Sequence, residues 1–303
     1  MRKTSIIVTG CDANFYPFMA EALQSLSNLG LDRRADIGVL NLGLTPGQVA
    51  TLSAMGCTVK EPGWSLSVSP AVAEATFKKY QIGLVARTAL RDYFPGYKVY
   101  LWFDADAWAQ TPEFFDTLVD GALANGAAVI RENGSHYKRD LIYTRWWFGN
   151  MVTSFGVWNG LKVAFKPAMN IGILALSDTA PHWEHWIDYY QHFIAKRGKV
   201  NNQHSFNAAV ELEHLPCFSA PARCNWITTL SAPAWNPATK MLCEPNSGAI
   251  PLSVIHMAGP DKRKPYTLQT TDGKTITTSL TYSAISAIQE PDDVGEVRQA
   301  RIA

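Results

Sequence analysis

Two carboxylates lie one residue apart, directly after a run of apolar and aromatic residues. Residues 99–103 form this run, and Asp104 and Asp106 follow it. An unbroken apolar run is typical of a central parallel strand covered on both faces, and such strands end at a ligand crevice. Carboxylates this close repel each other unless a cation lies between them, so they suit a divalent metal that also binds phosphate oxygens. A solvated turn before the next helix is the alternative interpretation, because Asp-x-Asp is common in loops.

A histidine later in the chain can complete a metal site. Residues 252–255 form a last apolar run, and His256 follows it. Two carboxylates and one imidazole suit Mn²⁺ slightly better than Mg²⁺. Lys262 and Lys264 come shortly afterwards, and a lysine there can neutralise the charge that develops on a departing diphosphate. Together these residues indicate chemistry in which a diphosphate is lost.

The elements that must position these residues alternate between strands and helices. We expect strands at residues 5–9, 36–40, 58–60, 99–103, 127–130, 169–176 and 252–255, and helices at 16–29, 46–55, 82–93, 112–125 and 181–196. This order predicts an α/β fold with a mostly parallel central sheet flanked by helices.

Other polar residues stand near the ends of these elements. Asp12 follows the first strand, and Asn170 begins an otherwise apolar strand, where its side chain needs a partner. Arg87 lies off the apolar stripe of its helix, where it is either a structural or solvated arginine or a ligand of an anion. The cluster around Asn202, Gln203 and His204 is either a loop or a surface that binds a ligand.

Two further segments have competing interpretations. The aromatic-rich residues 141–158 are expected to pack in the core, with a platform for an acceptor sugar as the alternative. In the helix at 181–196, His182, His185 and His192 are expected on the solvated side, because no carboxylate accompanies them as a metal ligand.

Composition restricts the class of protein. The 303 residues carry a formal net charge of +1, which argues against general binding of nucleic acid. The amino-terminal apolar run is too short for a signal peptide and no run reaches membrane-spanning length, so we expect a cytoplasmic protein. The five cysteines are odd in number and lack a Cys-x-x-Cys pair, which indicates buried free thiols. No amphipathic basic segment requires contact with a membrane.

Across residues 4–266 the sequence resembles the GT-A fold glycosyltransferases of family eight, the glycogenin and lipopolysaccharide galactosyltransferase type. The resemblance rests on motifs in the same order: Asp12 after the first strand, Arg87, Asp104-Ala105-Asp106, Asn170-Ile171-Gly172-Ile173, residues 202–207, Leu215-Pro216 with Asn225, and His256-Met257-Ala258-Gly259.

The resemblance implies transfer of a hexose from a nucleoside diphosphate sugar, such as a UDP-sugar, to a hydroxyl of a glycan, lipid-linked or protein acceptor, with retention of configuration. It assigns the nucleobase to Asp12, the metal to Asp104, Asp106 and His256, the donor sugar and its surroundings to Arg87, Asn170 and Gln203, the diphosphate to Lys262 or Lys264, and donor-binding motif positions to Ala105 and Gly259.

Two departures from the family pattern keep alternatives open. Aspartates are common where this chain has Asn202 and His204. The Lys-Pro-aromatic motif is displaced, so that either Lys262 or Lys264 can take its role. An inverting enzyme would need a general base, for which His204 is the candidate. A non-catalytic nucleotide-sugar or glycan binding protein would tolerate the altered cluster. A sugar nucleotidyltransferase would need a basic glycine-rich loop after the first strand, which residues 10–14 do not provide.

After the GT-A domain, predicted to span residues 1–266, we expect a separate unit. Residues 267–282 alternate in polarity around Asp272-Gly273, which predicts a hairpin, and the last residues are polar. Residues 267–303 are therefore predicted to form a hairpin and a polar tail.

Overall fold

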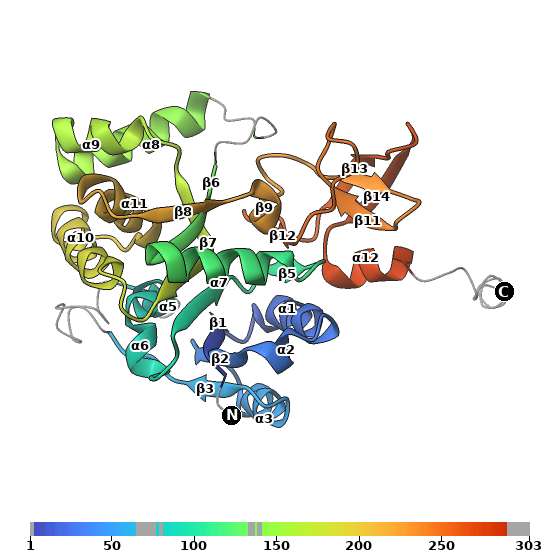
Figure 1. Cartoon of the computed structure of the whole chain (residues 1–303), viewed down its shortest axis with the longest axis horizontal. Helices are drawn as coiled ribbons and strands as arrows, with labels where there is room; N and C mark the ends of the chain where they lie inside the picture. Colours follow the sequence, from blue (N-terminus) through green and yellow to red (C-terminus); the bar gives the residue numbers. More distant parts are fainter. Residues whose placement is uncertain (1–2, 65–76, 79–80, 133–136, 138–140, 290–303) are drawn as a thin grey trace, which may run out of the picture.

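The computed structural model describes residues 3–64, 77–78, 81–132, 137 and 141–289. Its centre is a seven-stranded sheet with the strand order β3-β2-β1-β4-β7-β6-β8 (Figure 1). The strands are β1 (Ser5–Cys11), β2 (Asp36–Asn41), β3 (Thr58–Lys60), β4 (Val99–Phe103), β6 (Ala127–Arg131), β7 (Met169–Ser177) and β8 (Cys217–Ala220). Neighbouring strands are parallel except at β7, which is antiparallel to both β4 and β6. The predicted mostly parallel α/β sheet is confirmed.

Two apolar cores cover the two faces of this sheet, because successive side chains of a strand point to opposite sides. Ile7 of β1 lies in the core that includes α1 (Tyr16–Asn28), α2 (Leu31–Arg34), α3 (Pro46–Ala54) and α7 (Glu113–Asn125). Ile6 and Val8 lie in the opposite core, with α5 (Gln81–Ala86), α6 (Leu90–Tyr93), α10 (His182–Arg197) and α11 (Asn202–Leu212). A central strand such as β4 is therefore apolar throughout.

Antiparallel β7 brings its first residues to the edge where the parallel strands end. Ile130 near the end of β6 is paired with Asn170 near the start of β7, and Phe103 at the end of β4 is paired with Ile173. Asp104 and Asn170 therefore come from opposite ends of neighbouring strands and reach the same edge.

Short strands beyond the main sheet hold the carboxyl-terminal part of the chain. β5 (Ala107–Ala109), β12 (Val254–His256) and β9 (Trp226–Ile227) form one small sheet, and β10 (Ala234–Asn236) pairs with β11 (Met241–Cys243). The hairpin predicted around Asp272-Gly273 is formed by β13 (Pro265–Gln269) and β14 (Thr275–Ser279). α12 (Tyr282–Gln289), which the sequence analysis did not identify, follows it, and the polar tail beyond lies outside the described residues. The division into two units at residue 266 remains a prediction.

Two local expectations need correction. The predicted helix at 82–93 is interrupted, because a 3-10 segment (Arg87–Ala89) separates α5 from α6. His182 does not lie on a solvated face, since its ring is fully buried against Phe206. Burial disfavours the charged imidazolium and lowers the pKa of His182 to about 4.

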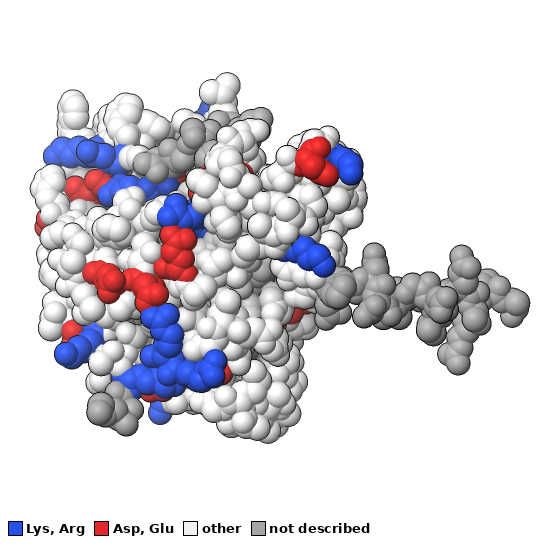
Figure 2. Space-filling view, turned by 45° about the vertical axis from the view of Figure 1, so that its right-hand side comes forward, with Lys and Arg blue, Asp and Glu red and all other residues white. Residues whose placement is uncertain are grey.

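The aromatic-rich segment forms a pair of helices at the upper left of Figure 1, α8 (Leu141–Phe155) and α9 (Val157–Ala164). Its inner face is buried, as expected for core packing, but several large apolar side chains of the pair are exposed. None of the described helices is long and apolar enough to span a membrane. On the face drawn in Figure 2, basic and acidic side chains are interspersed among much larger uncharged areas.

Candidate metal centre and adjoining cavities

Asp104 directs its two oxygens to different partners. Its Oδ1 accepts hydrogen bonds from the Arg87 guanidinium at 2.6 Å and from the Trp102 indole at 2.7 Å. Its Oδ2 lies 3.7 Å from Nε2 of His256. The guanidinium also stacks over the Trp102 ring, 4.2 Å from the centroid, so both the Asp104 carboxylate and the Trp102 ring fix the Arg87 side chain.

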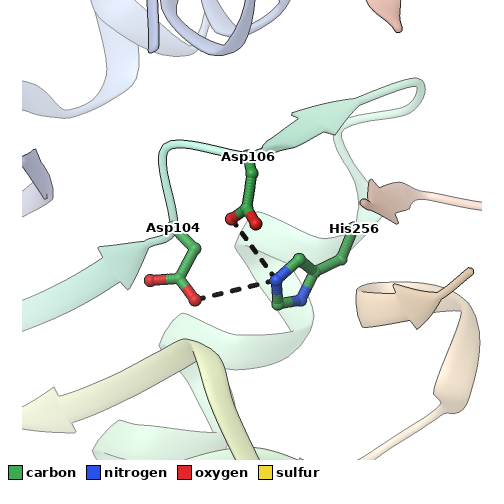
Figure 3. A group of neighbouring side chains, drawn as sticks. All are labelled: Asp104, Asp106 and His256. Atoms are coloured by element: carbon green, nitrogen blue, oxygen red, sulfur yellow. Dashed lines mark ion pairs between the residues drawn. The ribbon is translucent and has the colours of Figure 1, made fainter. Parts of the chain in front are cut away.

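Asp106 repeats this division. Its Oδ2 accepts a hydrogen bond from the ammonium group of Lys262, and its Oδ1 lies 3.4 Å from Nε2 of His256. One oxygen of each aspartate thus converges with the imidazole nitrogen, as Figure 3 shows, and the three ligand atoms lie within 4.8 Å of one another. Two hard oxygens and one imidazole nitrogen in this arrangement fit a divalent metal ion.

A chain of amide side chains sets the tautomer of His256. The backbone N–H of Gly172 can only donate, and it donates to Oδ1 of Asn170 at 2.9 Å. The same oxygen accepts from Nδ2 of Asn225 at 2.9 Å, which leaves Oδ1 of Asn225 facing Nδ1 of His256 at 2.9 Å. Nδ1 must therefore carry a proton, and Nε2 is the nitrogen that faces the two aspartates and would bind a metal ion through its lone pair.

The charges of this cluster stabilise one another. Burial alone would raise the pKa of the Asp106 carboxyl, but the positive charges and hydrogen bonds of His256 and Lys262 hold it well below its usual range. Burial would lower the pKa of His256, yet the neighbouring aspartates raise it. The Asp106 carboxyl thus stays ionised and offers negative charge to a cation.

The first cavity, of about 410 Å³, lies on the β1 side of the metal centre. Its lining includes Asp12, Phe15, Arg87, Trp102 and the stretch 104–106, so the predicted residues Asp12 and Ala105 share one cavity with both aspartates. One oxygen of Asp12 accepts the backbone N–H groups of residues 14 and 15, both at 3.0 Å. This turn fixes the direction of the Asp12 side chain.

The second cavity, of about 570 Å³, adjoins the amino-terminal end of α11. Asn201 caps that helix through a hydrogen bond to the backbone N–H of His204. Asn202, Gln203 and His204 all line the cavity, and so does Asn170. The predicted polar cluster therefore lies on the first turn of a helix rather than in a loop.

Some polar atoms of this cavity have no hydrogen-bond partner among the described residues. These are Nδ2 of Asn202 and both ring nitrogens of His204. The His204 ring is only 2% exposed and lies against Trp146, Trp147 and Phe193, with centroids 5.1 to 5.8 Å away. Burial lowers the pKa of His204 to about 4, so its ring is neutral at pH 7. Unpartnered polar atoms beside a cavity indicate space for a polar ligand.

A carboxylate that the sequence analysis missed, Glu132, also lines the second cavity. It directly follows β6, accepts a hydrogen bond from the Tyr143 hydroxyl at 2.6 Å, and accepts a weaker one from Asn170 at 3.3 Å. A polar residue that ends an apolar strand was the signal that identified Asp104, and the same signal applies to Glu132.

Comparison with known proteins places this geometry in a known fold. The sequence matches no protein-family model and no curated protein sequence. The galactosyltransferase LgtC, solved with donor and acceptor sugar analogs, is similar with a TM-score of 0.54 and 17% identity, over 84% of this chain and 87% of LgtC. The glycosyltransferase GlyE of Streptococcus pneumoniae is similar with a TM-score of 0.52 and 14% identity, over 96% of this chain and 61% of GlyE.

A third structure, the bifunctional glycosyltransferase WbbM, has a TM-score of 0.54 and 13% identity, over 86% of this chain and 46% of WbbM. The chain has the GT-A glycosyltransferase fold. The fold expected from the sequence resemblance is confirmed.

Within this GT-A fold the two candidate lysines occupy different positions. Lys262 bonds to Asp106 and donates to the backbone oxygens of Met257 and Gly259 at 2.9 and 2.8 Å. Lys264 lies over the Tyr266 ring, 5.2 Å from its centroid. Gly259 and both lysines line a third cavity, of about 670 Å³, beside Phe15. Only Lys262 among these three residues contacts the metal centre.

Proposed function

We propose that this protein is a metal-dependent glycosyltransferase that moves a hexose from a nucleoside diphosphate sugar, such as a UDP-sugar, to an acceptor hydroxyl with retention of configuration. The observation that carries the proposal is the convergence of Asp104, Asp106 and His256 on one point, with a cavity lined by the two aspartates on one side. Arg87 and Lys262 add positive charge beside the two carboxylates.

The metal would be Mn²⁺ or Mg²⁺, held by Asp104, Asp106 and His256. When bound, it supplies a Lewis acid that stabilises the negative charge of the departing diphosphate. The ammonium group of Lys262 lies beside the metal centre, where it donates to the backbone oxygens of Met257 and Gly259. It provides further positive charge for phosphate oxygens. Lys264 lines the third cavity with Lys262 and is the second candidate for a phosphate contact.

We assign the nucleoside to the first cavity, where Asp12 is the proposed nucleobase ligand and Ala105 part of the wall. The donor sugar would lie where Asn170 separates the metal centre from the second cavity, within reach of Gln203 and Asn202. Glu132 contributes the only carboxylate among the described residues of that cavity. It would replace the aspartates that the family commonly has at positions 202 and 204.

Retention is proposed because a front-face reaction needs no strong protein nucleophile. A phosphate oxygen of the donor can accept the proton of the acceptor hydroxyl, while Arg87 and Lys262 stabilise the diphosphate. Inversion would require a general base, and the 2% exposure of His204 and its three aromatic neighbours oppose that role.

The test is release of free nucleoside diphosphate from a panel of nucleotide sugars that includes UDP-galactose, with and without Mn²⁺. We expect release from one donor that requires the metal and is lost in Asp106→Asn. Asp120→Asn, which alters an exposed carboxylate on α7, is the matched control and should retain activity. The anomeric configuration of the product, determined by NMR, then distinguishes retention from inversion.

A donor that binds without release of diphosphate in any acceptor extract would refute the transferase proposal. That result would favour a non-catalytic nucleotide-sugar or glycan binding protein. Asn202 and His204, which replace the family's aspartates, are the residues that favour this second function.

A further inference from the structure

The helix pair α8–α9 exposes large apolar side chains to solvent. Leu141 and Ile142 are 87% and 80% exposed at the start of α8, and Trp158 is 81% exposed near the start of α9. Trp146, Val157 and Phe165 are also exposed on this pair. Half of the large exposed apolar residues in the described part of the chain therefore lie within one short segment. Clustered exposure of this kind indicates an interaction surface rather than ordinary surface composition.

The pair is a well-packed structure and not a loosely attached loop. On its inner face, Trp147, Met151 and Phe155 are buried with Phe193 of α10 and Ala208 of α11. The two helices approach so closely that a Cβ on Gly160 would lie 2.4 Å from Cα of Val152. The exposed side chains are therefore presented by a supported framework.

The charge of the segment is entirely positive. Residues 141–177 contain no Asp or Glu, and they include Arg145, Lys162 and Lys166, which are all exposed. Aromatic and aliphatic side chains that insert at an interface, with Lys and Arg beside them, are the combination that binds a membrane surface carrying anionic lipids.

We propose that the exposed face of α8–α9 docks onto the surface of an anionic lipid bilayer. Leu141, Ile142, Trp158 and Phe165 would enter the headgroup and acyl boundary, and the three basic residues would contact lipid phosphates. A symmetric dimer through this face is disfavoured, because it would place the same positively charged patch against itself.

The location of this face gives the docking a consequence for the acceptor. Tyr143 and Trp146 of α8 line the second cavity, so a bilayer against α8–α9 would lie close to one wall of that cavity. This step rests on the proposed glycosyltransferase function, and it selects a lipid-linked sugar as the acceptor class.

The docking is tested by flotation of the whole protein with vesicles of phosphatidylcholine, with or without about one third phosphatidylglycerol. We expect the protein to bind the anionic vesicles at least about tenfold more tightly than the neutral ones, and less tightly as salt increases. Trp158→Ser should weaken binding by about tenfold, and the double change Lys162→Glu with Lys166→Glu by at least as much.

Leu123→Ser is the matched control, because Leu123 is 55% exposed on α7, away from this face. It should bind vesicles like the wild type. Absence of binding to anionic vesicles, equal loss in the control, or a change of oligomeric state in place of vesicle binding would each overturn the proposal. The assay needs no sugar donor, so its failure is separate from failure of diphosphate release measured without vesicles.

Discussion

Gly172 lies where any side chain would collide with two groups of the metal centre. A Cβ at this position would stand 2.4 Å from Cε1 of His256 and 2.7 Å from Oδ2 of Asp104. Non-bonded carbon atoms prefer separations of about 3.5 to 4 Å, so Gly172→Ala must displace the imidazole by about 1 Å. The strand conformation at Gly172 suits alanine, so the effect comes from this contact and not from the backbone.

The expected loss of metal affinity follows from how little the distances between a metal ion and its ligands can vary. Ligand distances hold within about 0.2 Å, and changes that misplace a ligand cost roughly 10- to 100-fold in metal affinity. We therefore expect the dissociation constant for Mn²⁺ to rise by at least about tenfold, or about 1.4 kcal/mol. Overpacking should also lower the free energy of unfolding of the metal-free protein by about 1 to 3 kcal/mol.

The assay is calorimetric titration of Mn²⁺ into purified protein, with thermal unfolding of the same samples. Gly47→Ala is the matched control, since a Cβ on Gly47 in α3 meets nothing within 4 Å. The control should bind Mn²⁺ like the wild type. If Gly172→Ala bound Mn²⁺ with unchanged affinity, the assignment of Asp104 and His256 as converging ligands would be refuted.

Three further predictions concern neighbouring residues. Asn225→Leu removes the acceptor of the His256 Nδ1 proton. Mn²⁺ titration should show a roughly 10- to 100-fold weaker affinity with the fold retained. Unchanged affinity would mean that Asn225 does not set the tautomer of His256. Lys262→Met should lower the rate of diphosphate release by roughly 100-fold, whereas Lys264→Met, the matched control, should change it by less than about fivefold in initial-rate assays; the reverse order would transfer the role to Lys264. The pKa of buried His204 is about 4 in the folded protein against 6.5 in the unfolded chain, so the free energy of unfolding falls by about 3 kcal/mol as the pH falls from above 6.5 towards 4. His204→Phe should reduce this fall, as measured by urea unfolding at pH 7 and 4.5. An identical fall in the variant would contradict the prediction.

The sequence predicts the main sheet because its strands have strong, simple patterns. The apolar run before Asp104 and the alternation of strands and helices indicate most of the element order. They leave open the antiparallel direction of β7, and the edge strand β8 was not expected. Direction depends on how β7 pairs with β4 and β6, and a buried strand looks the same in either direction. The short strands β5, β9, β10 and β11 have only two or three residues each, too few for a recognisable period.

The candidate site shows the same limit at the level of single residues. Asp104, Asp106 and His256 are each recognisable at the end of an apolar run, and the structure brings them together. Glu132 carries the same signal, but its contact with Asn170 depends on the pairing of β6 with β7, which the sequence pattern does not show. The sequence does not reveal the exposed face of α8–α9, because apolar residues occur on both sides of α8. No amphipathic stripe distinguishes the outer face from the buried one.

The small sheet of β5, β12 and β9 couples the metal centre to strand register. His256 is paired with Ala107, the residue next to Asp106, and β12 runs antiparallel to β5. A slip of one residue in this pairing would turn the imidazole to the opposite face of the sheet. A metal ion held by Asp106 and His256 can therefore bind only the correctly registered chain, and at a concentration of 100 times its dissociation constant it would favour that register by about 2.7 kcal/mol. In this protein the ion would favour the correct strand register as well as bind phosphate.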